Sequence, residues 1–323
     1  MQKQKEELKI VFFGTPDFAV ESLRRLVDGG YHVVAVVTMP DKVGGRGHHT
    51  IRSAVAQYAI EHELPLLQPA NLKDDAFIGQ LQALQAQLFI VIAFRMLPQV
   101  VWQMPPLGTF NLHASLLPKY RGAAPINWAV MNGDTKTGVT TFFLKHEIDT
   151  GDIIQQRAID IARTDNVGDV HDRLMLLGAD MVVETVDTIL AGTVRPVAQN
   201  QLIASGADAT PAPKIFTATC RIPWKRSGEE VYNHIRGLSP YPAAWTELVM
   251  PDGTRRQVKI FATGEPLPGH ASPGAIVTDG KAQLSIATAD AVLPVHELQL
   301  AGKRRMQVPE FLRGFNIAGC HCE

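Results

Sequence analysis

The chain has 323 residues and a mass of 35.3 kDa, which is long enough for two domains. Hydrophobic residues make up 46% and charged residues 20% of the sequence, which excludes a disordered chain, a collagen and a coiled coil. The formal net charge of -1 excludes a polycation that coats nucleic acid, and three cysteines are too few for a disulfide scaffold.

The N-terminal stretch lacks the features of a signal peptide. Residues 1–14 carry mixed charge and only a short apolar run, and no later window approaches the roughly 18–20 apolar residues that span a bilayer. We therefore expect a cytoplasmic protein with free thiols at Cys220, Cys320 and Cys322. The last two flank His321 without a second ligand pair, so a mobile tail is expected there and no metal site.

Strands and helices alternate in the first half of the chain. A helix after Asp17 ends at Gly29-Gly30, and helical spacing predicts two more helices at 51–63 and 167–190. Short apolar runs predict strands at 8–13, 32–38, 88–93, 108–113 and 138–144. This alternation predicts an α/β fold with a mostly parallel sheet, whose ligands bind beyond the carboxyl ends of the strands.

The pattern changes near residue 192. Residues 192–214 are rich in proline and glycine. They are predicted to be a linker that packs along a first domain at 1–191 and leads to a second domain at 215–323. Short apolar runs with turn signals predict a small β barrel in the second domain, interrupted by one helix near 229–236. Residues 209–323 carry a net charge of +3 and residues 1–208 a net charge of -4, an asymmetry that favours nucleic-acid contact only slightly.

Several common cofactor motifs are absent. Gly14 follows the first predicted strand, but the sequence GTPDFAVES lacks the further glycines that let a backbone approach a pyrophosphate. The chain also has no phosphate-binding loop of the GxxxxGK[ST] type and no HExxH. Nicotinamide and nucleoside-triphosphate chemistry are therefore not expected.

Asn111 and His113 form the first part of a candidate site. They are two residues apart at the end of a predicted strand, so both side chains point to the same face. An amide beside an imidazole suits a reaction that builds charge on a carbonyl oxygen, because one group stabilises the oxyanion while the other donates or relays a proton. A polar strand end with a hydrogen-bonded histidine is the alternative.

The segments after His113 extend this candidate site. Residues 115–118 form a tight loop with an apolar wall that suits an aromatic ring, and a helix is expected to begin near Pro125. Asp149 follows the strand predicted at 138–144. If the carboxyl ends of both strands meet at one edge, its carboxylate orients the His113 ring and favours its protonated form. A simple turn residue is the alternative reading of Asp149.

These segments together closely resemble the folate-dependent formyltransferases, and the likeness runs nearly end to end with the members that formylate methionyl-tRNA. The segments that carry it are Asn111-Leu112-His113, Ser115-Leu116-Leu117-Pro118, Arg121 to Ile126, Asp149 to Asp152, Phe13 to Phe18, Pro40 to Lys42, Gly45 to Gly47, Pro223-Trp224, Pro240 to Trp245 and Leu300 to Lys303.

The resemblance implies a Rossmann-like catalytic domain followed by a C-terminal OB-like barrel. It implies 10-formyltetrahydrofolate as the formyl donor and methionyl initiator tRNA as the acceptor, with no metal. Asn111, His113 and Asp149 align with the catalytic residues of the family. Ser115, Leu116, Leu117 and Pro118 align with its folate-binding loop. The protein is expected to be a monomer.

The resemblance also implies tRNA contacts. Residues 40–49 align with a loop near the tRNA acceptor end, in which Arg46 matches an important arginine. Lys42 in this loop is a further predicted contact. Lys303 and Arg304 are also predicted contacts, because residues 303–305 are the densest basic cluster of the chain; a solvated charged turn is an equally simple interpretation of that cluster.

Two departures from the family pattern affect the surroundings of the site. His48-His49 replace a common lysine pair, which makes the predicted tRNA loop less basic. Phe94-Arg95 replace the commoner Tyr-Gly, which changes the expected shape of the folate pocket.

The implied reaction assigns a task to each candidate residue. Asn111 and His113 are the candidates to hold the oxyanion that forms when the amine attacks the formyl carbon. Asp149 would fix His113 and help to pass a proton to the leaving folate nitrogen.

Two rival functions stay open from the sequence. One is the same chemistry on a sugar nucleotide, a purine precursor or water, which would leave the basic loop and residues 209–323 without a task. The other is a non-catalytic RNA-binding protein, in which the grouping of Asn111, His113 and Asp149 would be accidental.

Overall fold

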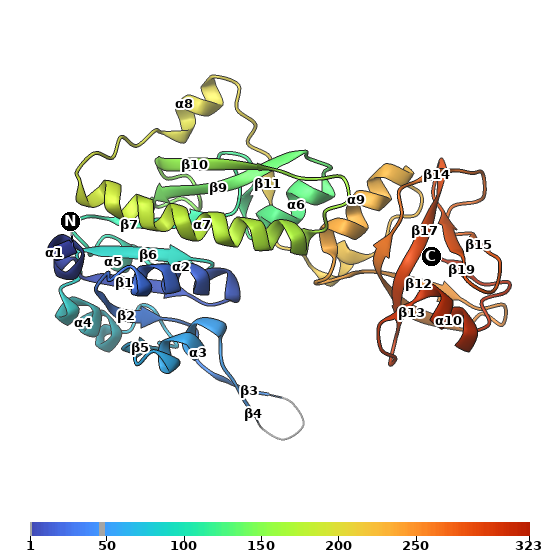
Figure 1. Cartoon of the computed structure of the whole chain (residues 1–323), viewed down its shortest axis with the longest axis horizontal. Helices are drawn as coiled ribbons and strands as arrows, with labels where there is room; N and C mark the ends of the chain where they lie inside the picture. Colours follow the sequence, from blue (N-terminus) through green and yellow to red (C-terminus); the bar gives the residue numbers. More distant parts are fainter. Residues whose placement is uncertain (1, 45–48) are drawn as a thin grey trace. The chain divides into compact units, whose positions relative to one another are not determined.

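The computed structural model describes residues 2–44 and 49–323, which fall into two compact units (Figure 1). The first unit comprises Met1–Gly122, Thr137–Ile159 and His171–Pro211, and the second comprises Ala123–Lys136, Asp160–Val170 and Ala212–Glu323. The predicted contact Arg46 and its neighbours Gly45, Gly47 and His48 lie outside the described residues.

A seven-stranded sheet forms the centre of the first unit within the described residues. Its order is β10-β9-β7-β6-β1-β2-β5. The strands are β1 (Ile10–Gly14), β2 (Val33–Val37), β5 (Leu66–Leu67), β6 (Leu88–Ile92), β7 (Thr109–His113), β9 (Lys136–Phe143) and β10 (Ile153–Asp160). The pairs from β5 to β7 are parallel and β9 runs antiparallel to β7. The prediction of an α/β fold with a mostly parallel sheet is confirmed.

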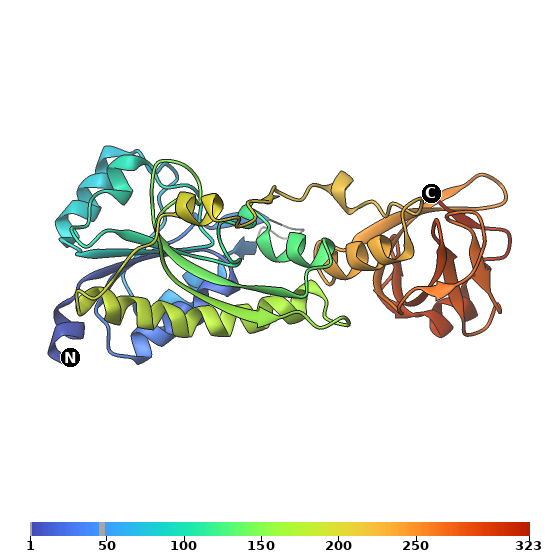
Figure 2. The same cartoon turned by 90° about the horizontal axis from the view of Figure 1, so that it is seen from above.

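Helices cover both faces of this sheet (Figure 2). Val11 and Phe13 of β1 pack on one face with Phe77 of α4 (Asp75–Leu84) and Val101 of α5 (Gln99–Trp102). The other face carries α2 (Asp17–Asp28), α3 (Ala54–Glu61) and α7 (Val167–Leu190). Because both faces are covered, β1 and β6 are buried along their whole length, as expected of continuous apolar runs.

An antiparallel sheet forms the core of the second unit. Its order is β15-β16-β17-β13-β12-β19, with β14 and β18 also pairing with β17. The strands are β12 (Ala244–Val249), β13 (Arg255–Thr263), β14 (Leu267–Pro268), β15 (Ile276–Thr278), β16 (Leu284–Ala287), β17 (Ala291–Leu300), β18 (Met306–Gln307) and β19 (His321–Cys322). A bridge between Ala275 and His321 joins the two ends of this order, so the sheet closes into a barrel.

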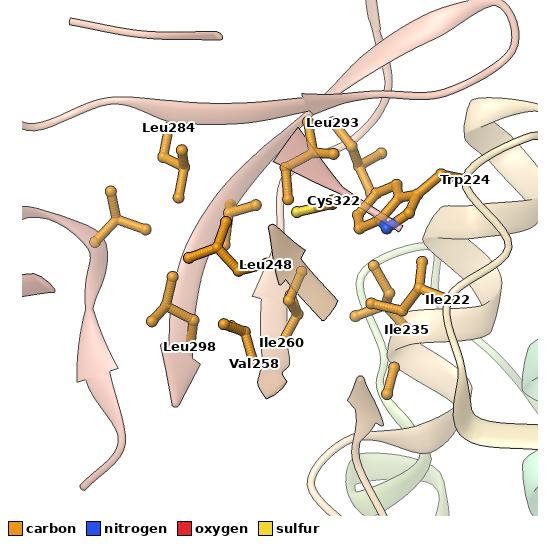
Figure 3. Packing of buried hydrophobic residues seen from close by; sticks show 14 of the residues in the cluster. Ile222, Trp224, Ile235, Leu248, Val258, Ile260, Leu284, Leu293, Leu298 and Cys322 are labelled. Atoms are coloured by element: carbon orange, nitrogen blue, oxygen red, sulfur yellow. The ribbon is translucent and has the colours of Figure 1, made fainter. Parts of the chain in front are cut away.

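The barrel encloses one apolar cluster (Figure 3). Leu248, Ile260 and Leu293 point into it from three strands, and α9 (Gly228–Leu238) adds Ile235. Trp224 closes the cluster near α9, where its indole N–H donates to Thr246 Oγ1 at 2.9 Å. A buried tryptophan therefore keeps its polar atom satisfied inside an apolar core.

The remaining elements are short. They are α1 (Gln2–Glu7), β3 (Lys42–Gly44), β4 (His49–Ile51), β8 (Arg121–Gly122), α6 (Pro125–Met131), α8 (Gln199–Ala204), β11 (Pro211–Ala212), a 3-10 helix (Thr217–Cys220) and α10 (Val308–Gly314). The strand β10, the helices α1, α4, α5, α8 and α10, and several of the two- and three-residue strands were not predicted from the sequence. No helix among the described residues is long and apolar enough to cross a bilayer.

The expectation of a mobile C-terminal tail is wrong. Cys320 and Cys322 are 7% and 6% exposed, and both belong to the barrel cluster. Cys322 N–H donates to the Gly274 carbonyl at 2.8 Å, and β19 pairs with β12. The last strand is thus held by backbone hydrogen bonds on both sides. Among the described residues no cluster of metal-ligating side chains occurs.

The contact between Gly274 and Cys322 yields a stability prediction. Gly274 has φ +85°, and a Cβ there would lie 2.1 Å from the Cys322 carbonyl oxygen. Gly280 has φ +70° with no atom within 4 Å of such a Cβ, so Gly280→Ala is a matched control. Both substitutions should cost about 1–2 kcal/mol through backbone strain. Gly274→Ala should cost about 1–3 kcal/mol more, because it separates β19 from the barrel. Urea unfolding measures the difference, and equal losses would contradict this role for β19.

Candidate active site

Strand β7 positions Asn111 and His113. The two residues alternate with the buried Phe110 and Leu112, so they share one face of the strand, as predicted. Asn111 is half-buried, and its side-chain amide makes no hydrogen bond to any described residue. This amide therefore keeps two N–H donors for a ligand.

His113 is held by a backbone carbonyl and faces a carboxylate. The ring is 7% exposed, and its Nε2 lies 2.8 Å from the Tyr120 carbonyl oxygen. Because a carbonyl only accepts, Nε2 carries a proton in this arrangement. Nδ1 then points toward Asp149 Oδ2 at 3.9 Å, which is too long for a direct hydrogen bond. At this distance the two groups form an ion pair only when the ring is protonated.

Asp149 reaches His113 by a different route from the one predicted. Because β9 is antiparallel to β7, its last residue Phe143 pairs with Phe110 at the opposite end of β7 from His113. The assumption that two carboxyl ends meet at one edge is therefore wrong. The segment between β9 and β10 instead folds so that Asp149, with φ +55°, presents its carboxylate to His113. Asp149 is thus both a turn residue and a partner of His113.

Two hydrogen-bonded contacts hold the Asp149 turn. Its Oδ2 accepts the Gly122 N–H at 2.9 Å. Its carbonyl accepts an N–H of Gln199 at 2.9 Å, and Gln199 also contacts Gly151 and Arg121. The sequence interpretation missed Gln199, because a single glutamine in the proline- and glycine-rich segment 192–214 carries no motif.

The predicted folate loop is ordered by Thr140 of β9. Thr140 Oγ1 donates to the Ser115 carbonyl at 2.6 Å and accepts the Leu117 N–H at 3.1 Å. Ser115, Leu117 and Pro118 are buried, and Leu117 packs in a small cluster with Phe142. Leu116 alone in this loop is half-exposed. The expected apolar wall is therefore reduced to Leu116 and the loop backbone.

The departure at Phe94-Arg95 has a structural explanation. Phe94 packs on Phe13, with ring centroids 5.7 Å apart. Arg95 donates to the carbonyls of Pro69 and Ala70, which ties the end of β6 to the segment after β5. Burial lowers the pKa of the Arg95 guanidinium from its usual value. Arg95 thus has a structural role, in which its guanidinium joins the segment after β6 to the segment after β5.

The basic residues predicted to contact tRNA differ in their availability. Lys42 and Lys303 are exposed, and neither side chain bonds to a described residue. Arg304 pairs with Glu310. The neighbouring Arg305 pairs with Glu297 and stacks 4.1 Å from the Phe261 ring. Lys303 is therefore the member of this cluster with a free charge among the described residues.

Known proteins match both parts of the chain. A family model described as formyl transferase matches residues 8–186, and one described as the formyl transferase C-terminal domain matches residues 214–316. A methionyl-tRNA formyltransferase from Bacteroides thetaiotaomicron is 60% identical over 316 residues, which cover 98% of both chains. One from Bacteroides fragilis is 61% identical over 97% of both chains.

Solved structures share the fold at lower identity. HypX from Aquifex aeolicus in complex with tetrahydrofolic acid is 18% identical with a TM-score of 0.63, over 96% of this chain and 47% of that one. An N-formyltransferase from Helicobacter canadensis with folinic acid and dTDP-3-aminofucose is also 18% identical with a TM-score of 0.63, over 93% of this chain and 100% of that one. The full-length identity near 60% and the two domain matches show that the chain belongs to the formyltransferase family, among the methionyl-tRNA formyltransferases.

Proposed function

We propose that this protein transfers the formyl group of 10-formyltetrahydrofolate to the α-amino group of methionyl initiator tRNA, which gives N-formylmethionyl-tRNA for translation initiation. The observation that carries the chemistry is the Asp149 carboxylate facing the buried His113 ring beside the open Asn111 amide. Identity with methionyl-tRNA formyltransferases along both domains supports the acceptor. We place the reaction in the cytoplasm, where initiator tRNA is charged. A monomeric state stays a prediction.

The attacking group is the free α-amino group of the methionyl ester. Its pKa is about 7.7–8.0 in unperturbed peptides, so a substantial fraction is unprotonated near neutral pH. The amine forms a bond to the formyl carbon, and the formyl oxygen takes on negative charge. Holding two large substrates in contact at one carbon supplies much of the rate acceleration.

Asn111 is the proposed oxyanion donor. Its amide is half-buried and lacks a partner among the described residues, so it can donate to developing charge without first breaking a bond. His113 is less suited to this task in the observed arrangement, because Nε2 is engaged by Tyr120 and Nδ1 faces Asp149. The oxyanion role therefore falls mainly to Asn111.

His113 and Asp149 are proposed to move the proton. The added amine becomes acidic as its bond to carbon forms, and its proton must reach the folate nitrogen before the old carbon–nitrogen bond breaks. Nδ1 and Oδ2 are 3.9 Å apart and make no direct hydrogen bond, so a water molecule or the attacking amine can contact both from one side. Asp149 stabilises the charged ring during this step.

The loop of Ser115, Leu116, Leu117 and Pro118 is the proposed folate contact. The half-exposed Leu116 offers an apolar surface, and the loop backbone is fixed by Thr140. A fixed backbone can bind a flat ring without first being ordered.

The test is formyl transfer by the purified protein. With 10-formyltetrahydrofolate and charged methionyl initiator tRNA, we expect N-formylmethionine on the tRNA, and no formylation of free methionine. Uncharged tRNA is the matched control, because it binds the same surfaces but lacks the amine. Folate turnover without formylated tRNA would move the acceptor to a sugar nucleotide, another amine or water. Binding of both substrates without turnover would support a binding protein instead.

We propose that Lys42, Arg46, Lys303 and Arg304 contact the tRNA backbone. The free charge of Lys303 supports its assignment, and the engagement of Arg304 by Glu310 makes that residue the weaker candidate. Arg46 rests on the sequence likeness alone. A barrel that carries a basic turn can hold a nucleic-acid backbone while the acceptor end reaches the catalytic residues.

Lys303→Ala tests this surface. Removing one phosphate contact should weaken tRNA binding and lower the slope of log affinity against log salt by about 1. Lys281→Ala is the matched control, because Lys281 is also an exposed lysine in a turn of the barrel. Filter binding at several salt concentrations measures both slopes. Identical slopes for Lys303→Ala and the wild type would remove Lys303 from the interface.

A further inference from the structure

We propose that Gln199 is a positioning residue of the active site, whose side-chain amide holds the Asp149 turn against Arg121 so that the Asp149 carboxylate faces His113. The inference rests on the proposed function and deepens it. Gln199 begins α8, in the segment that was predicted to be a linker packed along the first domain. Its side chain is turned inward, and the residue is 1% exposed.

Both ends of the Gln199 amide are used. Its Nε2 donates to the Asp149 carbonyl at 2.9 Å and to the Gly151 carbonyl at 2.8 Å. Its Oε1 accepts from Arg121 Nε at 3.0 Å and from Arg121 Nη2 at 2.7 Å. Two donors and one acceptor thus meet two carbonyls and one guanidinium. A fully satisfied buried amide restricts all the groups that it joins.

These bonds act on the residue that faces His113. Asp149 is in the left-handed region at φ +55°, a conformation that costs a residue with a side chain about 1 kcal/mol or more and needs support from its surroundings. Gln199 supports the main chain of the turn, and the Gly122 N–H supports its carboxylate. Gly122 bonds to the Asp149 carboxylate directly, and its neighbour Arg121 bonds to Gln199, which in turn bonds to the Asp149 carbonyl. One short segment therefore supports both the side chain and the main chain of Asp149.

The chemistry requires an amide at this position. A glutamate would keep the acceptor for Arg121 but would place negative charge against two carbonyl oxygens. An alanine would leave the carbonyls of Asp149 and Gly151 and the Arg121 guanidinium without these partners. In either variant the hydrogen bonds to the carbonyls of Asp149 and Gly151 are weakened or lost, so the Asp149 turn should move. A shift of about 1 Å at a catalytic group can cost about 10²-fold in rate.

The experiment is a double-mutant cycle on the full-length protein. Gln199→Ala, Gln199→Glu and Asp149→Asn are prepared singly, and each Gln199 variant is also combined with Asp149→Asn. Formyl transfer to charged methionyl initiator tRNA gives kcat and both KM values. Gln201→Ala is the matched control, since Gln201 is an exposed glutamine in the same helix.

If Gln199 acts through Asp149, both Gln199 variants should lower kcat by about 10–100-fold, with KM changed by less than about 3-fold. In the Asp149→Asn background the same substitutions should cost less than about 3-fold, because the group they position is already lost. Gln201→Ala should match the wild type. Full additivity of the two losses would overturn the proposal, as would wild-type kcat in Gln199→Ala.

A second readout does not depend on turnover. The Gly122 amide, which donates to Asp149 Oδ2, should exchange its hydrogen faster in Gln199→Ala and stay protected in Gln201→Ala. Unchanged protection would overturn the proposal. A wild-type kcat in Gln199→Glu together with a reduced kcat in Gln199→Ala would show that only the bond from Arg121 to residue 199 matters. That result would also overturn the proposal, because the bond to the Asp149 carbonyl would then have no effect. A wild-type protein without any transfer would instead refute the proposed function, on which the role of Gln199 rests.

Discussion

The active site depends on holding the Asp149 carboxylate beside His113. Strand β9 ends next to Phe110, at the opposite end of β7 from that histidine. The connection between β9 and β10 therefore has to turn back, and Asp149 takes a left-handed conformation at the turn. Such a turn would move freely without partners. The Gly122 N–H and the Gln199 amide are these partners. Three segments far apart in the sequence therefore set the distance between the Asp149 carboxylate and the His113 ring.

The rest of the first unit provides the rigid base for this arrangement. Strand β7 is paired on both sides, by β6 and by β9, so Asn111 and His113 cannot shift without breaking sheet hydrogen bonds. Thr140 of β9 fixes the adjacent loop, and the Tyr120 carbonyl fixes the His113 ring. A reaction that needs several groups at one carbon gains from this rigidity, because little reorganisation accompanies the charge that develops.

Strands and the faces of their side chains could be predicted from local sequence patterns. Buried apolar runs located β1, β6 and β7, and the two-residue spacing placed Asn111 and His113 on one face. Features that depend on tertiary contacts were missed. The sequence of β10 shows no clear alternation of apolar and polar residues. The segment around Cys322 has no apolar pattern that predicts its pairing with β12, and Gln199 belongs to no motif. Asp149 was placed near His113 correctly, but from a strand direction that is wrong, because sequence spacing does not reveal whether β9 is parallel.

Single-turnover formyl transfer by His113→Ala, measured together with its tRNA affinity, separates catalysis by His113 and Asp149 from tRNA binding. We expect transfer to fall by at least about 10²-fold, because the ring that works with Asp149 is gone. We expect unchanged tRNA affinity, since the proposed tRNA contacts lie on other residues, and retained binding would show that the variant is folded. Transfer at the wild-type rate would contradict the assignment of the chemistry to His113 and Asp149.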